Sequence, residues 1–225
     1  ITKVIDERAS FYCQDDIDLT RKKIHVLDQT FHLPDGGGKI HGFSADEVIR
    51  KMTIKPKNGA LLMRVTNYFK PQTILQVGCV GGFSTLYLSS YASNVQTVVL
   101  EENPEWASFD RLVFEKHRAK NVVLQEGAYK DTLPAVVSSV KRIDFVYFDS
   151  FNSPELNNFA FQQCLPLLHE KSVVMIAGIR RSDEMKECWK LFCASSDVVV
   201  TMDVYEFGIV FFDKKLYKRN YIVSF

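Results

Sequence analysis

The stretch TILQVGCVGGFSTLYLSSY, residues 73–91, changes character along its length. It begins as an apolar run typical of a buried strand, passes through Gly78, Gly81 and Gly82, and continues with the apolar spacing of a helix. Glycines have no side chain, so backbone N–H groups can approach a ligand there, and a helix that follows presents its N-terminus to an anionic group. The stretch therefore predicts a nucleotide-type cofactor site and leaves open which cofactor binds.

Strand-like and helix-like segments alternate on the C-terminal side of this stretch. The predicted strands are 73–78, 96–102, 122–127, 143–150 and 172–179, and the predicted helices between and after them are 83–93, 104–118, 130–140, 154–168 and 182–194. The strands are continuous runs rich in Val and Ile, as in a parallel sheet covered on both faces. Two further strands, 197–204 and 207–214, are separated by a short turn, which predicts a hairpin with an antiparallel last strand. We expect a three-layer, Rossmann-like α/β domain with a mainly parallel sheet of about seven strands.

Residues 1–55, on the N-terminal side, are predicted to form a helical cap on a main domain that spans residues 56–225. Residues 1–28 are amphipathic, charged and free of Gly and Pro, which favours a helix. Residues 31–43 contain Pro34 and three consecutive glycines, which predict a loop without regular structure.

Two shorter helices are expected before the glycine stretch. Ser44 and Glu47 have the Ser-x-x-Glu spacing of a capping box, which predicts the start of a short helix. Pro56 is a favoured first residue of a helix, and apolar residues recur at helical spacing from there to Phe69. The region before the first strand is therefore predicted to be mainly helical.

The composition narrows the classes of function. The chain has 225 residues and is 46% hydrophobic, enough for a substantial core in one domain. Its 28 basic and 27 acidic residues give a net charge of +1, so we expect no nucleic-acid partner. No apolar run approaches the roughly 20 residues of a membrane-spanning helix, so we expect no membrane partner. Five cysteines without a Cys-x-x-Cys pair favour reduced thiols and a cytoplasmic protein.

In an open α/β sheet, ligands bind outside the carboxyl ends of the strands, and this rule selects candidate cofactor residues. Ser84 lies in the first turn of the helix after the glycines, where a capping role is the alternative. Glu101 ends the second strand about 20 residues after Gly78, where an acid can accept both ribose hydroxyls of NAD or of S-adenosylmethionine. Gly127 and Ala128 follow the third strand and are small enough to let an adenine lie against the backbone.

Candidate substrate residues follow the fourth and fifth strands. Asp149 ends an otherwise apolar strand, a placement that favours substrate or metal chemistry over its alternative as a turn-forming residue. Asn152 lies close behind it, and Arg180 and Arg181 follow the fifth strand. The two arginines either attract an anionic substrate or form a solvated pair at the start of a helix.

The spacing of the glycines distinguishes between cofactors. A dinucleotide fingerprint is GxGxxG, but here Cys79 and Val80 follow Gly78, so the second glycine is absent. The spacing is instead GxxxG, from Gly78 to Gly82. Together with the acid at Glu101 and the terminal hairpin, it favours S-adenosylmethionine over NAD.

These motifs resemble those of class I S-adenosylmethionine-dependent methyltransferases. The resemblance is strongest to the O-methyltransferase group that includes the catechol and caffeoyl-CoA enzymes and many bacterial relatives. The first motif of that group, E-x-G-x-x-x-G-[YFI]-S-[TA], is similar to QVGCVGGFST at residues 76–85. VVLEENPE, residues 98–105, and GAYKDTLP, residues 127–134, are similar to its second and third motifs. The resemblance covers about residues 56–213.

The resemblance implies a role for each matching residue. Gly78 and Gly82 would pass close to the methionine part of the cofactor, and Ser84 would help to hold its carboxylate. Glu101 would bind the ribose, and residues 127–128 would border the adenine. A small-molecule methyl acceptor is implied as the partner, and the resemblance leaves a homodimer open.

Several positions depart from the pattern of the group. Gln76 replaces an acid, and its amide can still hydrogen-bond the ammonium of the cofactor but lacks the charge. Ala128 stands where relatives often have Asp. Asp149 matches a magnesium ligand of metal-dependent members, but Ala177 and Gly178 replace the acidic end of the fifth strand. Magnesium needs several hard oxygen ligands, so we expect no metal.

The function expected from these residues is metal-independent O-methyl transfer to a small molecule. Asp149 is the candidate base or orienting residue, and Asn152, Arg180 and Arg181 are the candidate substrate residues. The alternative is a degenerate member of the group that binds a ligand or another protein without catalysis.

Overall fold

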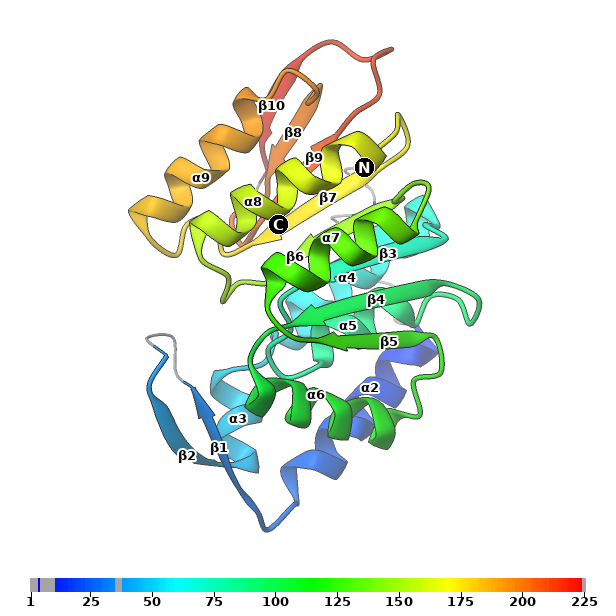
Figure 1. Cartoon of the computed structure of the whole chain (residues 1–225). Coiled ribbons are helices and arrows are strands. Elements are labelled where there is room, and N and C mark those ends of the chain that lie inside the picture. Colours follow the sequence, from blue (N-terminus) through cyan, green and yellow to red (C-terminus); the bar gives the residue numbers. More distant parts are fainter. Residues whose placement is uncertain (1–3, 5–10, 35–37, 224–225) are drawn as a thin grey trace.

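The computed structural model describes residue 4 and residues 11–34 and 38–223. Within these residues an eight-stranded sheet has the spatial order β10-β8-β9-β7-β6-β3-β4-β5. Helices cover both of its faces (Figure 1). Its strands are β3 (Thr73–Val77), β4 (Gln96–Glu101), β5 (Val122–Glu126), β6 (Phe145–Phe148), β7 (Val173–Ala177), β8 (Val200–Asp203), β9 (Phe207–Phe211) and β10 (Arg219–Ile222).

The strand directions confirm the predicted sheet. Strands β3 to β7 pair in parallel, and β9 pairs antiparallel with both β7 and β8. The last predicted strand is therefore antiparallel, as the short turn before it indicated. Strand β10, parallel to β8, was not predicted. All four of its residues are exposed, so its sequence lacks the apolar alternation that marks a half-buried strand.

The side chains of the sheet alternate between two apolar cores, one on each face. In β3, for example, Ile74 packs into the first core, and Leu75 and Val77 pack into the second. The first core is shared with α2 (Tyr12–His25), α3 (Ala45–Lys51), α4 (Pro56–Phe69), α5 (Phe83–Ser89) and α6 (Pro104–His117). The second is shared with α7 (Tyr129–Ser139), α8 (Pro154–Cys164) and α9 (Asp183–Ala194), and the short helix η1 (Leu165–Leu167) follows α8. This arrangement is the predicted three-layer architecture.

The N-terminal region contains a β-hairpin where a loop was predicted. Strands β1 (Thr30–Pro34) and β2 (Ile40–Ser44) pair antiparallel, so the prediction of an irregular loop over 31–43 was wrong. Pro34 takes the last position of β1, and the glycines fall between the strands, so neither interrupts the pairing. Phe31 packs edge-to-face on Phe109 of α6, with 4.8 Å between ring centroids, which joins the hairpin to the first core.

The helices of the N-terminal region begin largely where their sequence signals indicate. Ser44 caps α3: its hydroxyl accepts from the Glu47 backbone N–H at 3.3 Å, and its own N–H donates to the Glu47 carboxylate at 3.1 Å. Helix α4 begins at Pro56 as expected. Helix α2 ends at His25, and most of the first ten residues of the helix predicted over 1–28 lie outside the described residues. Nowhere in the described residues does a helix have the length and apolarity needed to cross a membrane.

Candidate functional site

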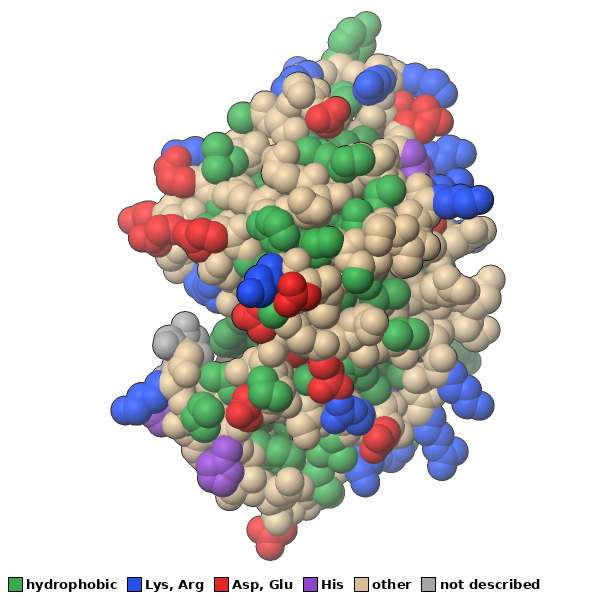
Figure 2. All heavy atoms as spheres, in the orientation of Figure 1, with side chains coloured by type: hydrophobic (Ala, Val, Ile, Leu, Met, Phe, Trp, Pro, Cys, Tyr) green, Lys and Arg blue, Asp and Glu red, His purple; other side chains and the backbone are tan. Residues whose placement is uncertain are grey.

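The candidate site lies at the carboxyl ends of β3, β4 and β6. Strand β3 lies between β4 and β6, so the chain order reverses beside it, and such switch points are where open α/β sheets bind ligands. Two cavities open here, one of about 750 Å³ and one of about 190 Å³, and both are lined by Val80 and Phe151. The larger one reaches the surface between the β1–β2 hairpin and the start of α8, where Figure 2 shows a hollow.

The larger cavity brings together residues that lie far apart in the chain. Gly78 comes from the loop after β3, Glu101 from the end of β4, Tyr129 from the start of α7, and Asn152 from the loop after β6. Trp106 of α6 adds an aromatic wall. Gly78, Glu101 and Asn152 were predicted as site residues from the sequence.

Gly78 begins the glycine loop with a φ of 77°, a conformation that costs residues with a side chain. A Cβ at this position would lie 2.1 Å from Oδ1 of Asn152. The Asn152 amide donates to the carbonyl of Val77 at 2.8 Å and to Oδ1 of Asn157 at 3.0 Å. Asn152, expected to contact substrate, is thus buried beneath the loop and fixes its start.

Gln76 and Ser84 form a closed hydrogen-bond network behind the loop. The Gln76 amide donates to the carbonyl of Gly78 at 2.9 Å and to the hydroxyl of Ser84 at 3.1 Å. Its Oε1 accepts from the hydroxyl of Thr85 at 2.9 Å. Both Gln76 and Ser84 are buried, and neither lines the two cavities. Gly82, before α5, faces Val113 of α6, so it permits close helix packing.

Glu101 connects the glycine loop to the segment that leads into α6. Its Oε2 accepts from the backbone N–H of Cys79 and its Oε1 from that of Asn103, both at 2.8 Å. Burial raises the pKa of Glu101 to about 7; the charge of Asp149 acts in the same direction, and the backbone hydrogen bonds oppose it. Each carboxylate oxygen can accept a second hydrogen bond, so Glu101 retains capacity for a ligand.

Gly127 and Ala128 lie at the same edge of the sheet. Strand β5 pairs with β4 up to Glu126, opposite Glu101, and the N–H of Gly127 donates to the Glu101 carbonyl at 3.1 Å. The two residues directly precede Tyr129, whose side chain lines the larger cavity. The structure therefore brings the predicted adenine-bordering pair next to the predicted ribose-binding acid.

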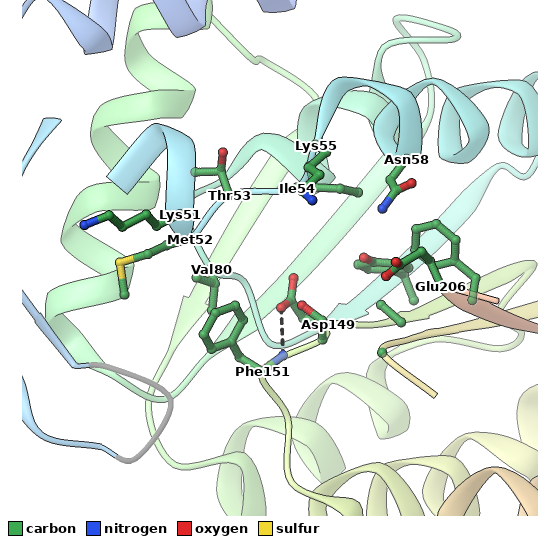
Figure 3. A pocket seen from close by; sticks show the side chains of 15 residues that line it. Lys51, Met52, Thr53, Ile54, Lys55, Asn58, Val80, Asp149, Phe151 and Glu206 are labelled. Atoms are coloured by element: carbon green, nitrogen blue, oxygen red, sulfur yellow. Dashed lines mark hydrogen bonds between the residues drawn. The ribbon is translucent and has the colours of Figure 1, made fainter. Parts of the chain in front are cut away.

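The smaller cavity contains Asp149, the candidate catalytic residue (Figure 3). Asp149 is buried, and its Oδ1 accepts from the backbone N–H of Phe151 at 3.2 Å. Burial raises its pKa to about 6, while backbone hydrogen bonds and the charge of Arg181 lower it. Asp149 is therefore mainly ionised at neutral pH and can accept a proton.

Tyr147 also lines the smaller cavity and was not predicted as a site residue. It is 2% exposed, and its hydroxyl has no hydrogen-bond partner among the described residues. A signal was present in the sequence: Tyr147 lies two residues before Asp149, at the distance that places side chains on the same face of a strand.

Arg21 of α2 holds the wall of the smaller cavity opposite Asp149. Its guanidinium donates to the hydroxyl of Thr53 at 2.8 Å and to the carbonyl of Ile54 at 2.5 Å, and it lies 4.1 Å from the ring centroid of Phe83. Its only sequence signal is the helical spacing that places it on the buried face of α2, with Ile17 and Ile24.

The two arginines predicted as substrate residues lie outside the lining of both cavities. Arg180 pairs with Asp203 at 2.6 Å and lies over the ring of Tyr205, with its guanidinium 5.1 Å from the ring centroid. Arg181 donates to the carbonyl of Asn152 at 3.1 Å. The structure therefore gives both arginines partners within the protein.

The carboxylates that line the smaller cavity are those of Asp149 and of the exposed Glu206. Ala177 and Gly178 line the same cavity and offer no side-chain oxygen. In the described ranges, no three His, Cys, Asp or Glu side chains are grouped as metal ligands.

A further acid, Asp110 of α6, is fully buried near the site. Neither of its carboxylate oxygens has a hydrogen-bond partner among the residues described. Burial raises its pKa well above the usual range, and the charge of Glu101 adds to this effect. The native protein therefore holds a proton on Asp110 that the unfolded chain releases at a lower pH.

Asp110→Asn is expected to stabilise the protein more at pH 8 than at pH 5. The pKa of Asp110 is higher in the native state than in the unfolded state. At a pH above the unfolded-state pKa this difference lowers the free energy of unfolding, and the loss grows as the pH rises toward the native-state pKa. Asparagine does not titrate, so the variant lacks this loss of stability. Urea denaturation at both pH values measures the difference in the free energy of unfolding between variant and wild type, with the exposed Asp197→Asn as control. An equal difference between variant and wild type at both pH values would contradict the prediction.

Comparisons with known proteins agree with this architecture. No protein-family model matches the chain. The chain is 25% identical over 134 residues to the catechol O-methyltransferase of Mycobacterium tuberculosis, which covers 58% of this chain and 59% of that protein. It is 24% identical over 132 residues to catechol O-methyltransferase B of Danio rerio, which covers 57% of this chain and 50% of that protein. The matches thus span between half and three-fifths of these curated relatives.

A solved structure matches over nearly the whole chain. The O-methyltransferase of Bacillus cereus, crystallised with S-adenosylhomocysteine, aligns over 93% of this chain and 95% of its own, with a TM-score of 0.64 and 16% identity. The chain therefore has the Rossmann-like fold of the O-methyltransferases, and in sequence it resembles the catechol O-methyltransferases.

Proposed function

We propose that this protein transfers a methyl group from S-adenosylmethionine to a hydroxyl group of a small molecule, without a metal ion. The observation that carries the proposal is the pair of adjoining cavities: one contains Glu101 beside the glycine loop, and the other contains the buried Asp149. The similarity to catechol O-methyltransferases and to a structure crystallised with S-adenosylhomocysteine supports it.

The residues of the larger cavity fit an adenosyl cofactor. Glu101 has a free lone pair on each carboxylate oxygen, which suits the two hydroxyls of a ribose. Tyr129 and Trp106 offer aromatic surface for the adenine, next to Gly127 and Ala128. The volume of about 750 Å³ falls within the range of cofactor pockets.

The smaller cavity suits the acceptor. When bound, S-adenosylmethionine supplies an electrophilic methyl group on a positively charged sulfur, which keeps the electron pair of the broken C–S bond. Val80 and Phe151 line both cavities, so an acceptor in the smaller one lies beside the larger. Asp149 accepts the proton that the acceptor hydroxyl loses as its oxygen gains the methyl group.

The affinity for S-adenosylhomocysteine is expected to fall about tenfold between pH 8 and pH 6. Ribose hydroxyls donate to an ionised Glu101, whose pKa of about 7 makes it mostly ionised at pH 8 and mostly protonated at pH 6. Glu101→Gln should bind more weakly at pH 8 and lose this pH dependence. Isothermal titration calorimetry measures both, with the exposed Glu115→Gln of α6 as control.

Two results would count against the proposal. Absence of S-adenosylhomocysteine binding at millimolar concentration would overturn the cofactor assignment. Wild-type affinity in Glu101→Gln would place the ribose elsewhere.

A second candidate is a ligand-binding or interaction module that has lost catalysis. The observation in its favour is Gln76, whose amide is used entirely by Gly78 of the loop and by Ser84 and Thr85 of α5. The O-methyltransferase group that the sequence resembles has an acid at this position. This candidate predicts S-adenosylhomocysteine binding without methyl transfer from S-adenosylmethionine to any hydroxylated acceptor, measured by mass spectrometry.

A further inference from the structure

The walls of the smaller cavity carry opposite charges at opposite ends. Lys55 and Asn58 lie along one wall, across the cavity from Asp149 (Figure 3). Neither Lys55 nor Asn58 has a side-chain hydrogen bond or ion pair with the described part of the chain. Lys51 differs, because its amine is paired with Glu47 at 2.8 Å. Lys55 is therefore the cation available to a ligand in this cavity.

The floor of the cavity can recognise a hydroxyl group. Asp149 offers a carboxylate, and Tyr147 offers a hydroxyl that lacks a partner among the described residues. The Tyr147 hydroxyl does not belong to the fully buried unpaired side-chain atoms of the described residues, so a ligand in the cavity can reach it and hydrogen-bond to it. A hydroxyl placed between the two could donate to Asp149 and accept from Tyr147.

The remaining walls favour a flat apolar body. The rings of Tyr147, Phe151 and Phe207 and the side chains of Val80 and Ile54 line the space between the two polar ends. Aromatic walls favour stacked or edge-to-face contact with another ring. The volume of about 190 Å³ suits a single ring with short substituents.

The charges of the lining disfavour a ligand with more than one negative charge. Asp149 and the exposed Glu206 both line the cavity and oppose one free cation, Lys55, among the described lining residues. A doubly charged phosphate would meet more repulsion than attraction there. A carboxylate can pair with Lys55 and accept a hydrogen bond from the amide of Asn58.

We propose that the methyl acceptor is a small aromatic hydroxy acid, bound with its hydroxyl at Asp149 and Tyr147 and its carboxylate at Lys55 and Asn58. This inference rests on the proposed function, because it names the acceptor of that same site. The ring spans the cavity, and the carboxylate sets which hydroxyl faces Asp149.

Three probes with the same ring test the charge of the acceptor. Calorimetry at pH 8 with saturating S-adenosylhomocysteine compares 4-hydroxybenzoate with the neutral 4-hydroxybenzamide and the cationic 4-hydroxybenzylamine. The wild-type protein is expected to bind 4-hydroxybenzoate about tenfold more tightly than the amide, because one charge-assisted contact distinguishes them. The amine is expected to bind most weakly.

Variants identify the residues responsible. Lys55→Gln should remove the preference for 4-hydroxybenzoate over the amide, and Lys55→Arg should keep it. Tyr147→Phe should weaken the binding of all three probes by a similar factor. Lys57→Gln, two residues further on and outside the lining of either cavity, should change none of these values.

The outcomes separate this inference from the proposed function. If S-adenosylhomocysteine binds but the benzoate and the amide bind equally, or the amine binds best, the acceptor class is overturned and the proposed function stands. If none of the probes binds to the S-adenosylhomocysteine complex, the acceptor class is also overturned. If S-adenosylhomocysteine itself does not bind, both proposals are overturned.

Discussion

Gly78→Ala is expected to lower the free energy of unfolding by about 3 kcal/mol and to abolish binding of an adenosyl ligand. The left-handed backbone at Gly78, with a φ of 77°, costs a residue with a side chain about 1–2 kcal/mol. The new Cβ would also lie 2.1 Å from Oδ1 of Asn152, so that side chain must leave its place. Its hydrogen bonds to Val77 and Asn157 would then break, at a further cost of about 1–3 kcal/mol. Urea denaturation and calorimetry measure the two effects.

Gly38→Ala is the matched control, because Gly38 has a φ of 80° but an added Cβ meets nothing within 4 Å. It should show the backbone cost alone, about 1–2 kcal/mol. Gly78→Ala should also cost less in an Asn152→Gly background, since the clash is then absent. Equal losses for Gly78→Ala and Gly38→Ala would show that Asn152 does not constrain the loop.

Arg21→Ala is expected to lower the free energy of unfolding by about 2–4 kcal/mol and to loosen the wall of the smaller cavity. The substitution removes the donor to Thr53 and Ile54, the contact with the Phe83 ring and the volume of a buried side chain. Hydrogen–deuterium exchange should therefore accelerate at the amides of residues 53–55 and 57–59.

Arg50→Ala is the control for the loss of an arginine. Arg50 pairs with Asp46 at 2.8 Å on the surface of α3, and exposed ion pairs contribute little to stability. It should leave exchange at residues 53–55 and 57–59 unchanged. Unchanged exchange at these amides in Arg21→Ala would show that the wall does not depend on Arg21.

The sheet could be predicted because its pattern is local. Each buried strand is a short apolar run bounded by turn residues. Helices α6, α8 and α9 begin at side-chain caps, Asn103, Ser153 and Ser182, so few long-range effects intervene. The hairpin of β1 and β2 was missed because Pro34 and the glycines dominate the segment, although Pro34 is the last residue of β1 and the three glycines come between the two strands in the sequence. Whether this segment forms a hairpin depended on where the proline and the glycines stand relative to the paired residues, more than on how many of them there are.

The positions of Gly78 and Glu101 at the larger cavity could be predicted because both residues follow strand ends. Gly78 and Glu101 needed only the rule that ligands bind at the carboxyl ends of parallel strands. Lys55 and Arg21 could not be found this way, since they reach the site from helices and connections before the sheet. The same limit applies to Arg180, whose partner Asp203 lies in another strand.

The direction of the hydrogen bonds around Gln76 determines what would happen if Gln76 were replaced by glutamate, the acid expected at this position from the resemblance. The amide donates twice, to the Gly78 carbonyl and to Ser84, and accepts once, from Thr85. A glutamate here would place a second carboxylate oxygen against the Gly78 carbonyl, where both atoms carry partial or full negative charge. Ser84 would have to turn from acceptor to donor. The hydrogen-bonding groups around position 76 are thus complementary to an uncharged amide. A Gln76→Glu substitution would fit only if the surrounding polar groups changed as well.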